Sequence, residues 1–389
     1  MMTNMPHLHA FIVMLGYASL VAAAGYVVLA VVAVLAWQLR RRTGTTLSPP
    51  PVSVLKPLCG AEPGLYEHLR SFCEQDYPEF EIVYGVREPD DPACAVVRRL
   101  IAEFPDLPMK LVVDAQLHGS NRKVSNLINM LPYAHHEVLV MADSDVVVGR
   151  DYLGAVTAPL RDRGVGLVTC LYRGVPTPGI WSRLGAMYIN EWYIPSVLLT
   201  WLFGYEGYVS GQTLCMRSSV LRAIGGLQVL VDQLAEDYRL GELVRGLNLR
   251  IVLSPYLLSG EHHEPDLSSM TRHELRWMRT IRVLRPRSFL VIFATFSLPL
   301  ALIGIIFASA TGVSIVAWSL FAVILISRIT LHFVHRVRGQ RSMLSDFWLL
   351  PVRDLLICWI WCRSLFSSRV NWRGNEFDVD ANGVMRHLT

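Results

Sequence analysis

Three groups of carboxylates, far apart along the chain, have the residue types that a site for a metal–diphosphate needs. Asp90-Asp91 follows the apolar run of residues 81–86, and Asp143-Ser144-Asp145 follows the apolar run of residues 138–142. A third group, Glu236-Asp237, opens a helical stretch. Ligands of α/β sheets bind beyond the carboxyl ends of the strands. We therefore expect a site that holds a metal–diphosphate and removes a proton from an acceptor hydroxyl.

Asp143 and Asp145 are the candidate metal ligands. They lie two residues apart just after a strand, so both side chains can point to one side and converge on a hard cation. Mg²⁺ or Mn²⁺ takes carboxylate oxygens and fills its other positions with waters and substrate phosphates. The alternative is a solvated turn that caps the next helix. The position after an apolar strand, together with the other acids, favours the metal site.

Two segments have residues suited to a nucleotide. Asp91 precedes Pro92 and a helix-like run, where it either caps the helix or accepts hydrogen bonds from a base or ribose. The sequence leaves both roles open. Residues 119–126 place Lys123, with the amide of Asn126, in a turn at a helix start, which suits an anionic ligand. The alternative there is an ordinary polar loop.

Asp237 is the candidate general base, because a carboxylate within about 3 Å of an acceptor hydroxyl can take its proton. We expect Glu236 to be a surface acid, since neighbours on a helix point in different directions. Arg276 is expected to stabilise a departing diphosphate, where a fixed cation contributes most, and Trp277 to wall the acceptor site. A simpler interpretation makes Arg276-Trp277 an anchor at a membrane surface.

The composition indicates one globular domain tied to a membrane. The chain has 389 residues, is 52% hydrophobic and has a mean hydropathy of +0.36, which is too apolar for an ordinary soluble enzyme. Its net charge is only +4, and the arginines lie beside apolar segments, which favours a membrane surface and not nucleic acid as the partner. Seven scattered cysteines without a CxxC pair predict neither a disulfide framework nor a zinc site.

Apolar segments predict the membrane topology. Residues 11–37 are long enough to span a bilayer. Arg40-Arg41-Arg42 follow this segment, so the N-terminus is expected outside and the following domain in the cytosol. Residues 289–308 and 313–333 predict a helical hairpin with both ends in the cytosol. Residues 347–366 are interrupted by charges, which favours an interfacial or re-entrant helix over a further span. Basic residues flank the hairpin: Arg279, Arg282, Arg285 and Arg287 before it, and His335, Arg336, Arg338 and Arg341 after it.

Between the membrane segments, short β-rich runs alternate with amphipathic stretches of about ten residues. This alternation predicts right-handed βαβ units on a mainly parallel sheet, an α/β fold. The expected strands are residues 52–57, 81–86, 109–113 and 138–141, and the expected helices are residues 65–72, 94–103 and 123–130.

In combination, these motifs resemble the ceramide glucosyltransferase family of GT-A glycosyltransferases, from about Val52 to Gly374. The resemblance implies that Asp91 serves the nucleotide, Asp143 and Asp145 the metal–diphosphate, and Asp237 the base role. The segments that carry it are Val54-Leu55-Lys56-Pro57-Leu58 with Gly60, Asp90-Asp91-Pro92-Ala93, residues 119–127, Asp143-Ser144, Ser210-Gly211, Cys215-Met216-Arg217, Gly225-Gly226-Leu227, residues 235–238, Arg276-Trp277 and Trp372-Arg373.

The apolar segments and the resemblance together predict a domain plan. Residues 1–45 would form the membrane anchor and 46–285 a cytosolic, Rossmann-like GT-A domain. Residues 286–335 would form the transmembrane hairpin, and 336–389 the interfacial or re-entrant helix with a cytosolic tail.

One element departs from the family pattern. The family has Gln or Arg as the first residue of its (Q/R)xxRW element, and this chain has His273 there, which leaves a donor-side contact open. The tandem His262-His263-Glu264 has no counterpart in the pattern. We expect these residues at the surface, with a metal role as the less favoured alternative.

Residues 119–127 and 169–174 look most similar to a bacterial branch of the family associated with hopanoid biosynthesis. That branch implies an enzyme of the bacterial inner membrane that transfers N-acetylglucosamine from a UDP-sugar to a hopanoid polyol such as bacteriohopanetetrol. A ceramide glucosyltransferase that uses UDP-glucose is the alternative. A processive polysaccharide synthase and a non-catalytic membrane scaffold remain open, although the synthase would need more spans. The sequence does not specify an oligomeric state.

Overall fold

The computed structural model describes residues 5–40, 49–205, 207–310, 312–334, 346–367, 370–372, 375–380 and 383–387. The chain divides into two compact units. The helical unit comprises Met1–Leu39, Pro176–Gly204 and His262–Ser368. The sheet unit comprises Arg40–Val175, Tyr205–Glu261 and Arg369–Thr389. Arg41, Arg42, Arg373 and Gly374 lie outside the described residues, as do His335, Arg336, Arg338 and Arg341.

The sheet unit is built on an eight-stranded sheet with the order β3-β2-β1-β4-β7-β6-β8-β5. Strands β3, β2, β1 and β4 are parallel, whereas β7 pairs with β4 in the antiparallel direction. The four parallel strands lie where the sequence predicts them, as do the helices between them. The strands are β1 (Val52–Pro57), β2 (Phe80–Val86), β3 (Met109–Val113), β4 (Val138–Ala142), β5 (Val146–Val147), β6 (Val165–Pro176), β7 (Thr213–Arg217) and β8 (Arg250–His262).

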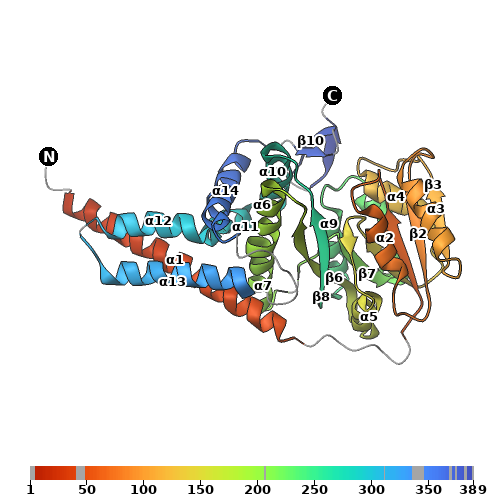
Figure 1. The fold of residues 1–389 in the computed structure, drawn as a ribbon, viewed down its shortest axis with the longest axis horizontal. Coiled ribbons are helices and arrows are strands. Elements are labelled where there is room, and N and C mark those ends of the chain that lie inside the picture. The colour runs from red at the N-terminus through yellow and green to blue at the C-terminus, as the bar shows by residue number, and fades with distance from the viewer. Residues whose placement is uncertain are drawn as a thin grey trace. The chain divides into compact units, whose positions relative to one another are not determined.

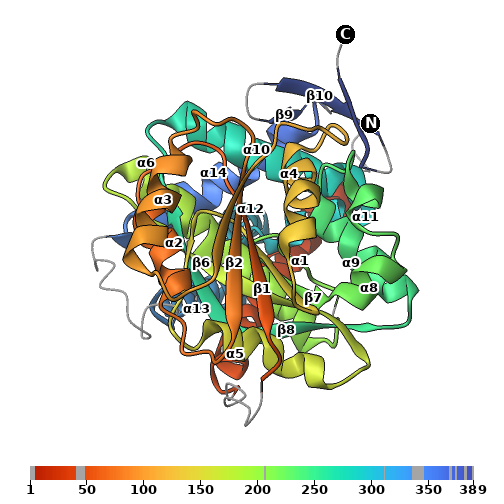
Figure 2. The ribbon, with the colours of Figure 1, turned by 90° about the vertical axis from the view of Figure 1, so that its right-hand side faces the viewer.

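Helices cover both faces of the parallel strands, with α2 and α3 on one face and α4 on the other (Figure 2). All five residues of β4 are buried, which explains why this strand is a continuous apolar run. The core beneath α4 and α9 includes Leu55, Leu139 and Leu240. The helices are α2 (Leu65–Cys73), α3 (Ala93–Glu103), α4 (Arg122–Met130), α5 (Tyr152–Thr157), α8 (Ser218–Ala223) and α9 (Glu236–Gly246). A small antiparallel sheet follows, made of β9 (Val370–Trp372), β10 (Asn375–Val379) and β11 (Met385–His387).

In the helical unit, α1 (Met5–Gln38), α12 (Ser297–Ala308) and α13 (Ile315–Val334) pack along one another (Figure 1). Glycines allow a close approach of α1 and α12, because a Cβ atom on Gly16 would lie 2.4 Å from the Ala308 nitrogen. The other helices are α6 (Ile180–Tyr188), the π-helical turn η3 (Ile189–Tyr193), α7 (Ile194–Leu202), α10 (Leu267–Leu284), α11 (Pro286–Val291) and α14 (Leu349–Ser364).

Among the described residues, two helices are long and apolar enough to cross a membrane, His7–Gln38 and α13. The first arm of the predicted hairpin is not one straight helix. Pro286–Thr295 and Ser297–Ala308 meet at an angle of 63° and together would make a third span. Pro299 explains the break, since proline is accepted in the first turn of a helix but disrupts its interior. The 16-residue α14 occupies the segment expected to be interfacial or re-entrant.

Candidate active site

The parallel strands bring the predicted acidic segments to one edge of the sheet. Val54 of β1 lies opposite Ile82 of β2 and Val140 of β4, so the carboxyl ends of these strands share an edge. Asp91 and Asp143 both follow such ends. The tertiary structure adds the start of α9 to this edge, because Asp237 and Asp143 both lie beside Lys123.

Lys123 links two of the acidic segments. Its Nζ lies 2.5 Å from Asp143 Oδ1 and 2.9 Å from Glu236 Oε1. The expectation that Glu236 is a surface acid is therefore wrong. Only 12% of its side chain is exposed, because Glu236 is the first residue of α9 and the loop before that helix is bound to the start of α4. The same cation was predicted to bind an anionic ligand, and in the structure it neutralises two carboxylates.

Hydrogen bonds hold the start of α4 against the loop before α9. Asn121 caps α4 by accepting from the Val124 N–H at 3.1 Å, and its Nδ2 donates to the Gln233 carbonyl at 2.8 Å. The Ser120 N–H donates to Asp232 Oδ1 at 2.8 Å. A Cβ atom on Gly119 would lie 2.7 Å from the Val231 carbonyl oxygen. The glycine-containing turn predicted as a ligand loop thus also fixes the position of Lys123.

Each carboxylate oxygen of Asp237 accepts a hydrogen bond from a backbone N–H group. Gly211 N–H donates to Oδ2 at 2.9 Å and Tyr238 N–H donates to Oδ1 at 2.7 Å. Burial and the neighbouring Glu236 carboxylate raise the pKa of Asp237 to about 6. A carboxylate with a pKa near neutrality is suited to general base catalysis, since it is ionised at pH 7 and still basic enough to take a proton.

A small pocket lies beside these groups. Lys123, Gly211 and Glu236 contribute to its lining, and apolar side chains such as Leu127 and Leu240 form other walls. Its volume of about 10 Å³ is close to the room that a single water needs, so it is a packing gap and not a site for a nucleotide-sugar.

Lys56 also lies at this edge; it belongs to the Val54–Leu58 segment that carries the family resemblance, but the sequence pattern assigns it no role. It is fully buried in β1, its Nζ donates to the backbone carbonyl of Asp143, and it lies 3.7 Å above the ring of Phe72. Burial lowers the pKa of Lys56 to about 7, against the opposing effect of Asp143 and Asp145. A lysine inside an apolar strand is an available signal, because buried lysines are rare unless they are paired.

The donor set of Asp143 and Asp145 fits a hard divalent cation. Oδ1 of Asp145 is buried and has no hydrogen-bond partner among the described residues, which leaves an acceptor free for a ligand. Burial raises the pKa of Asp143 despite the proximity of Lys123. The structure gathers no group of three or more histidine, cysteine, aspartate or glutamate side chains for a metal within the described ranges. A cation here would need waters and substrate oxygens, as Mg²⁺ usually does.

Asp91 and Asn126 have structural contacts in addition to their predicted role toward the nucleotide. The Asp91 carboxylate accepts from the Gly60 N–H at 3.0 Å and from the Ala93 N–H at 2.8 Å, at the start of α3. The Asn126 amide is 5% exposed and donates to the Gly85 carbonyl at 2.8 Å. Both side chains therefore hold loops at the strand ends, and their contact with a nucleotide stays a prediction.

Arg276 and Trp277 lie on α10 of the helical unit. The Trp277 ring is stacked on Tyr188, with centroids 5.4 Å apart and an interplanar angle of 28°. His273 lies 4.2 Å and His262 6.4 Å from the same ring, measured between centroids. The altered first residue of the family element thus packs directly against its tryptophan.

The tandem histidine segment is not a surface loop throughout. His262 and Glu264 are 7% and 6% exposed, contrary to our expectation, while His263 is exposed. Glu264 is buried because it accepts from His273 Nδ1 at 2.9 Å and from Ser269 Oγ at 2.7 Å. This segment therefore packs beside the rings of His273 and Trp277 on α10.

Comparison with known proteins identifies the family. The Glycosyl transferase family 21 pattern matches residues 17–385. The chain belongs to this family. Family 21 membership makes it a glycosyltransferase and confirms the resemblance drawn from the motifs.

Relatives of this family 21 chain include two curated proteins of Caenorhabditis elegans. Ceramide glucosyltransferase 3 is 22% identical over 89% of this chain and 76% of its own length. Ceramide glucosyltransferase 1 is 24% identical over 87% of this chain and 73% of its own length.

A solved structure shares the fold of the family 21 chain. The mannosyltransferase PcManGT from Pyrobaculum calidifontis, in complex with GDP-Man and Mn²⁺, is 20% identical. It matches 88% of this chain and 99% of its own with a TM-score of 0.53. The expected GT-A-like α/β fold is thereby confirmed.

Proposed function

We propose that this protein is an inverting glycosyltransferase that moves one sugar from a UDP-sugar to a hydroxyl of a membrane lipid. The observation that carries the proposal is the Asp237 carboxylate. It is held by two backbone N–H groups beside Lys123 and has a pKa of about 6. In a family 21 chain with helices apolar enough to cross a membrane, we propose a membrane lipid as the acceptor.

In this proposal Asp237 takes the proton of the acceptor hydroxyl while the lipid oxygen attacks the anomeric carbon. The attack comes from the face opposite UDP, so no covalent sugar intermediate forms and an α-donor gives a β-glycoside. The backbone donors of Gly211 and Tyr238 orient the carboxylate. Arg276 and Trp277 keep the roles that the resemblance implies, toward the departing diphosphate and the acceptor respectively.

Asp143 and Asp145 are the residues that would hold Mg²⁺ or Mn²⁺. The metal supplies positive charge for the diphosphate of the bound donor. Lys123 holds Asp143 in place from the protein side, at 2.5 Å. The nucleotide is proposed to contact Asp91 and Asn126 at the neighbouring strand ends.

We favour a hopanoid polyol as the acceptor and UDP-N-acetylglucosamine as the donor, because residues 119–127 and 169–174 resemble the bacterial branch of the family associated with hopanoid biosynthesis. Ceramide with UDP-glucose is the second candidate, because the C. elegans relatives are ceramide glucosyltransferases. A bacterial inner membrane and a cytosolic catalytic domain follow from the first candidate and from the flanking arginines.

The test incubates purified protein with bacteriohopanetetrol or ceramide, each with UDP-N-acetylglucosamine or UDP-glucose, and identifies the glycolipid by mass spectrometry. A single-sugar hopanoid product supports the favoured specificity, and glucosylceramide supports the second. The Asp237→Asn protein is the matched control for product formed without the base. A polymer would indicate a processive synthase, and the absence of any glycolipid in all four mixtures would contradict the proposal.

A further inference from the structure

A buried arginine of α14 forms a two-pronged ion pair with α10. Arg353 Nη1 and Nη2 donate to Glu274 Oε1 and Oε2 at 2.8 and 2.7 Å. Arg353 is 1% and Glu274 2% exposed. Replacing such a pair by apolar residues often leaves stability unchanged or improves it. The pair therefore calls for a role other than stability.

Both ends of this ion pair lead to the ring of Trp277. Glu274 lies three residues before Trp277 on α10, so the two side chains are neighbours on the helix surface. On the other side, the Arg353 guanidinium lies 5.5 Å from the centroid of the Tyr188 ring, which is the ring stacked on Trp277. Arg353 Nη1 also donates to the Leu184 carbonyl at 3.3 Å, one turn before Tyr188 on α6.

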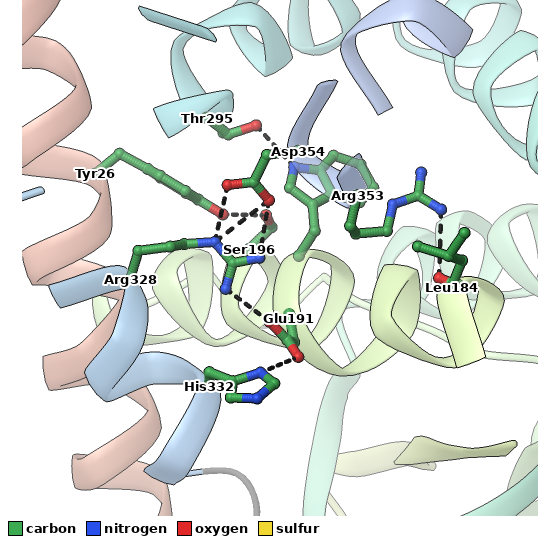
Figure 3. A network of polar contacts seen from close by, with 10 residues as sticks. Tyr26, Leu184, Glu191, Ser196, Thr295, Arg328, His332, Arg353 and Asp354 are labelled. Carbon is green, nitrogen blue, oxygen red and sulfur yellow. Dashed lines mark hydrogen bonds and ion pairs between the residues drawn. The ribbon is translucent and has the colours of Figure 1, made fainter. Parts of the chain in front are cut away.

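The next residue of α14 fixes the helix from the opposite direction. Asp354 accepts from Arg328 of the candidate membrane helix α13 at 2.8 Å, and Arg328 donates to Glu191 of η3 at 2.7 Å (Figure 3). His332 of α13 lies against the other Glu191 oxygen at 2.6 Å. Charges inside membrane helices are costly unless they are paired. This network therefore gives α14 one position against α13, and with it one position for Arg353.

We propose that Arg353 is a positioning residue that fixes the ring of Trp277 for the lipid acceptor. The guanidinium holds α10 through Glu274 and holds the stacked Tyr188 ring through its face, so the two supports of Trp277 cannot move independently. The role toward the acceptor rests on the proposed function, whereas the positioning of the ring does not.

The test uses Arg353→Lys, which keeps the charge but loses the planar fork that makes two parallel hydrogen bonds. We expect the KM for the lipid acceptor to rise roughly 2- to 30-fold, the range for coupling through a packed network. The KM for the UDP-sugar should stay unchanged. Arg363→Lys is the matched control, because Arg363 lies on the same helix but is exposed and faces Trp359.

A second readout is independent of activity. Acrylamide quenching of Trp277 is obtained as the difference between proteins with and without Trp277→Phe, in otherwise wild-type and Arg353→Lys chains. We expect Trp277 to become more accessible in Arg353→Lys and to be unchanged in Arg363→Lys. If Arg353→Lys does not fold, Glu274→Gln removes one charge of the same pair and should give the same two changes.

The outcomes separate the inference from the proposed function. Unchanged quenching of Trp277 in the folded variants would overturn the positioning role, as would a donor KM that rises as much as the acceptor KM. If the wild-type chain transfers no sugar to lipid while Arg353→Lys still alters the quenching of Trp277, the positioning role is supported and the proposed function is contradicted.

Discussion

The Lys123 ammonium lies 2.5 Å from Asp143 and 2.9 Å from Glu236, so one partly buried cation joins the candidate metal site to the start of the helix that carries the candidate base. Each carboxylate depends on the same partner. The two roles that we propose for these residues, holding the donor and removing the acceptor proton, would thus be electrostatically connected.

Replacing the candidate base should reduce turnover. Asp237→Asn keeps the size of the side chain but cannot accept a proton at neutral pH. We expect kcat to fall by about 10²–10⁴ with donor affinity little changed. Glu242→Gln is the control, because Glu242 lies on the same helix and pairs with Arg239 at 3.1 Å. Near-normal turnover of Asp237→Asn, or an α-linked product by NMR, would contradict the mechanism.

The pH dependence should follow Asp237. Because the base acts in its ionised form and its pKa is about 6, kcat/KM should fall about tenfold per pH unit below pH 6. Glu236→Gln removes the neighbouring negative charge that raises this pKa, so its acidic limb should move to lower pH. The measurement is kcat/KM between about pH 4.5 and 8, a range close to that in which most proteins are stable. A limb that moves upward, or does not move, would exclude this coupling.

The metal assignment predicts a loss of binding. Asp143→Ala and Asp145→Ala should each lose the dependence of UDP binding on Mg²⁺ or Mn²⁺, measured by calorimetry with and without the cation. Asp162→Ala is a suitable control, since Asp162 is exposed and pairs with Arg250. If both site variants bind UDP and metal as the wild type does, the two aspartates are not the metal ligands.

Close packing of α1 on α12 predicts different tolerance of two glycines. Gly16→Ala would place a methyl group 2.4 Å from the Ala308 nitrogen, so it should lower stability by about 1–3 kcal/mol, the usual cost of overpacking. Gly25→Ala has no neighbour within 4 Å of the new carbon and should leave Tm unchanged or slightly higher. Thermal unfolding in detergent compares the two. Equal Tm values would show that the contact yields without cost.

The flanking arginines predict the topology of the hairpin. A cysteine placed at Ser309, in the connection after α12, should react with a membrane-impermeant reagent added outside intact cells. A cysteine at Arg287, before α12, should react only after the membrane is opened. The background for both would lack the native cysteines. Labelling of position 287 from outside would reverse the proposed orientation.

Much of the fold could be predicted from the sequence, because local patterns specify local structure. The parallel strands from Val52–Pro57 to Val138–Ala142 are buried apolar runs, and the helices between them have amphipathic periods. The acids could be assigned to the sheet edge because Asp143 directly follows such a run and Asp91 follows another after a short turn. The apolar segments α1 and α13 were also evident from length and hydropathy.

Only the tertiary structure decided how distant residues meet. The antiparallel β7 beside β4, the Lys123–Glu236 pair and the burial of Lys56 depend on contacts between segments that no local period encodes. The pattern of α9 alone predicts a surface position for Glu236, whereas in the structure the loop at the start of α4 covers the start of this helix. Likewise, Arg353 appeared as a charge interrupting an apolar segment, and its partner Glu274 is 79 residues away. Pairing energies at such separations depend on the folded arrangement, which is why residue type and spacing alone left them open.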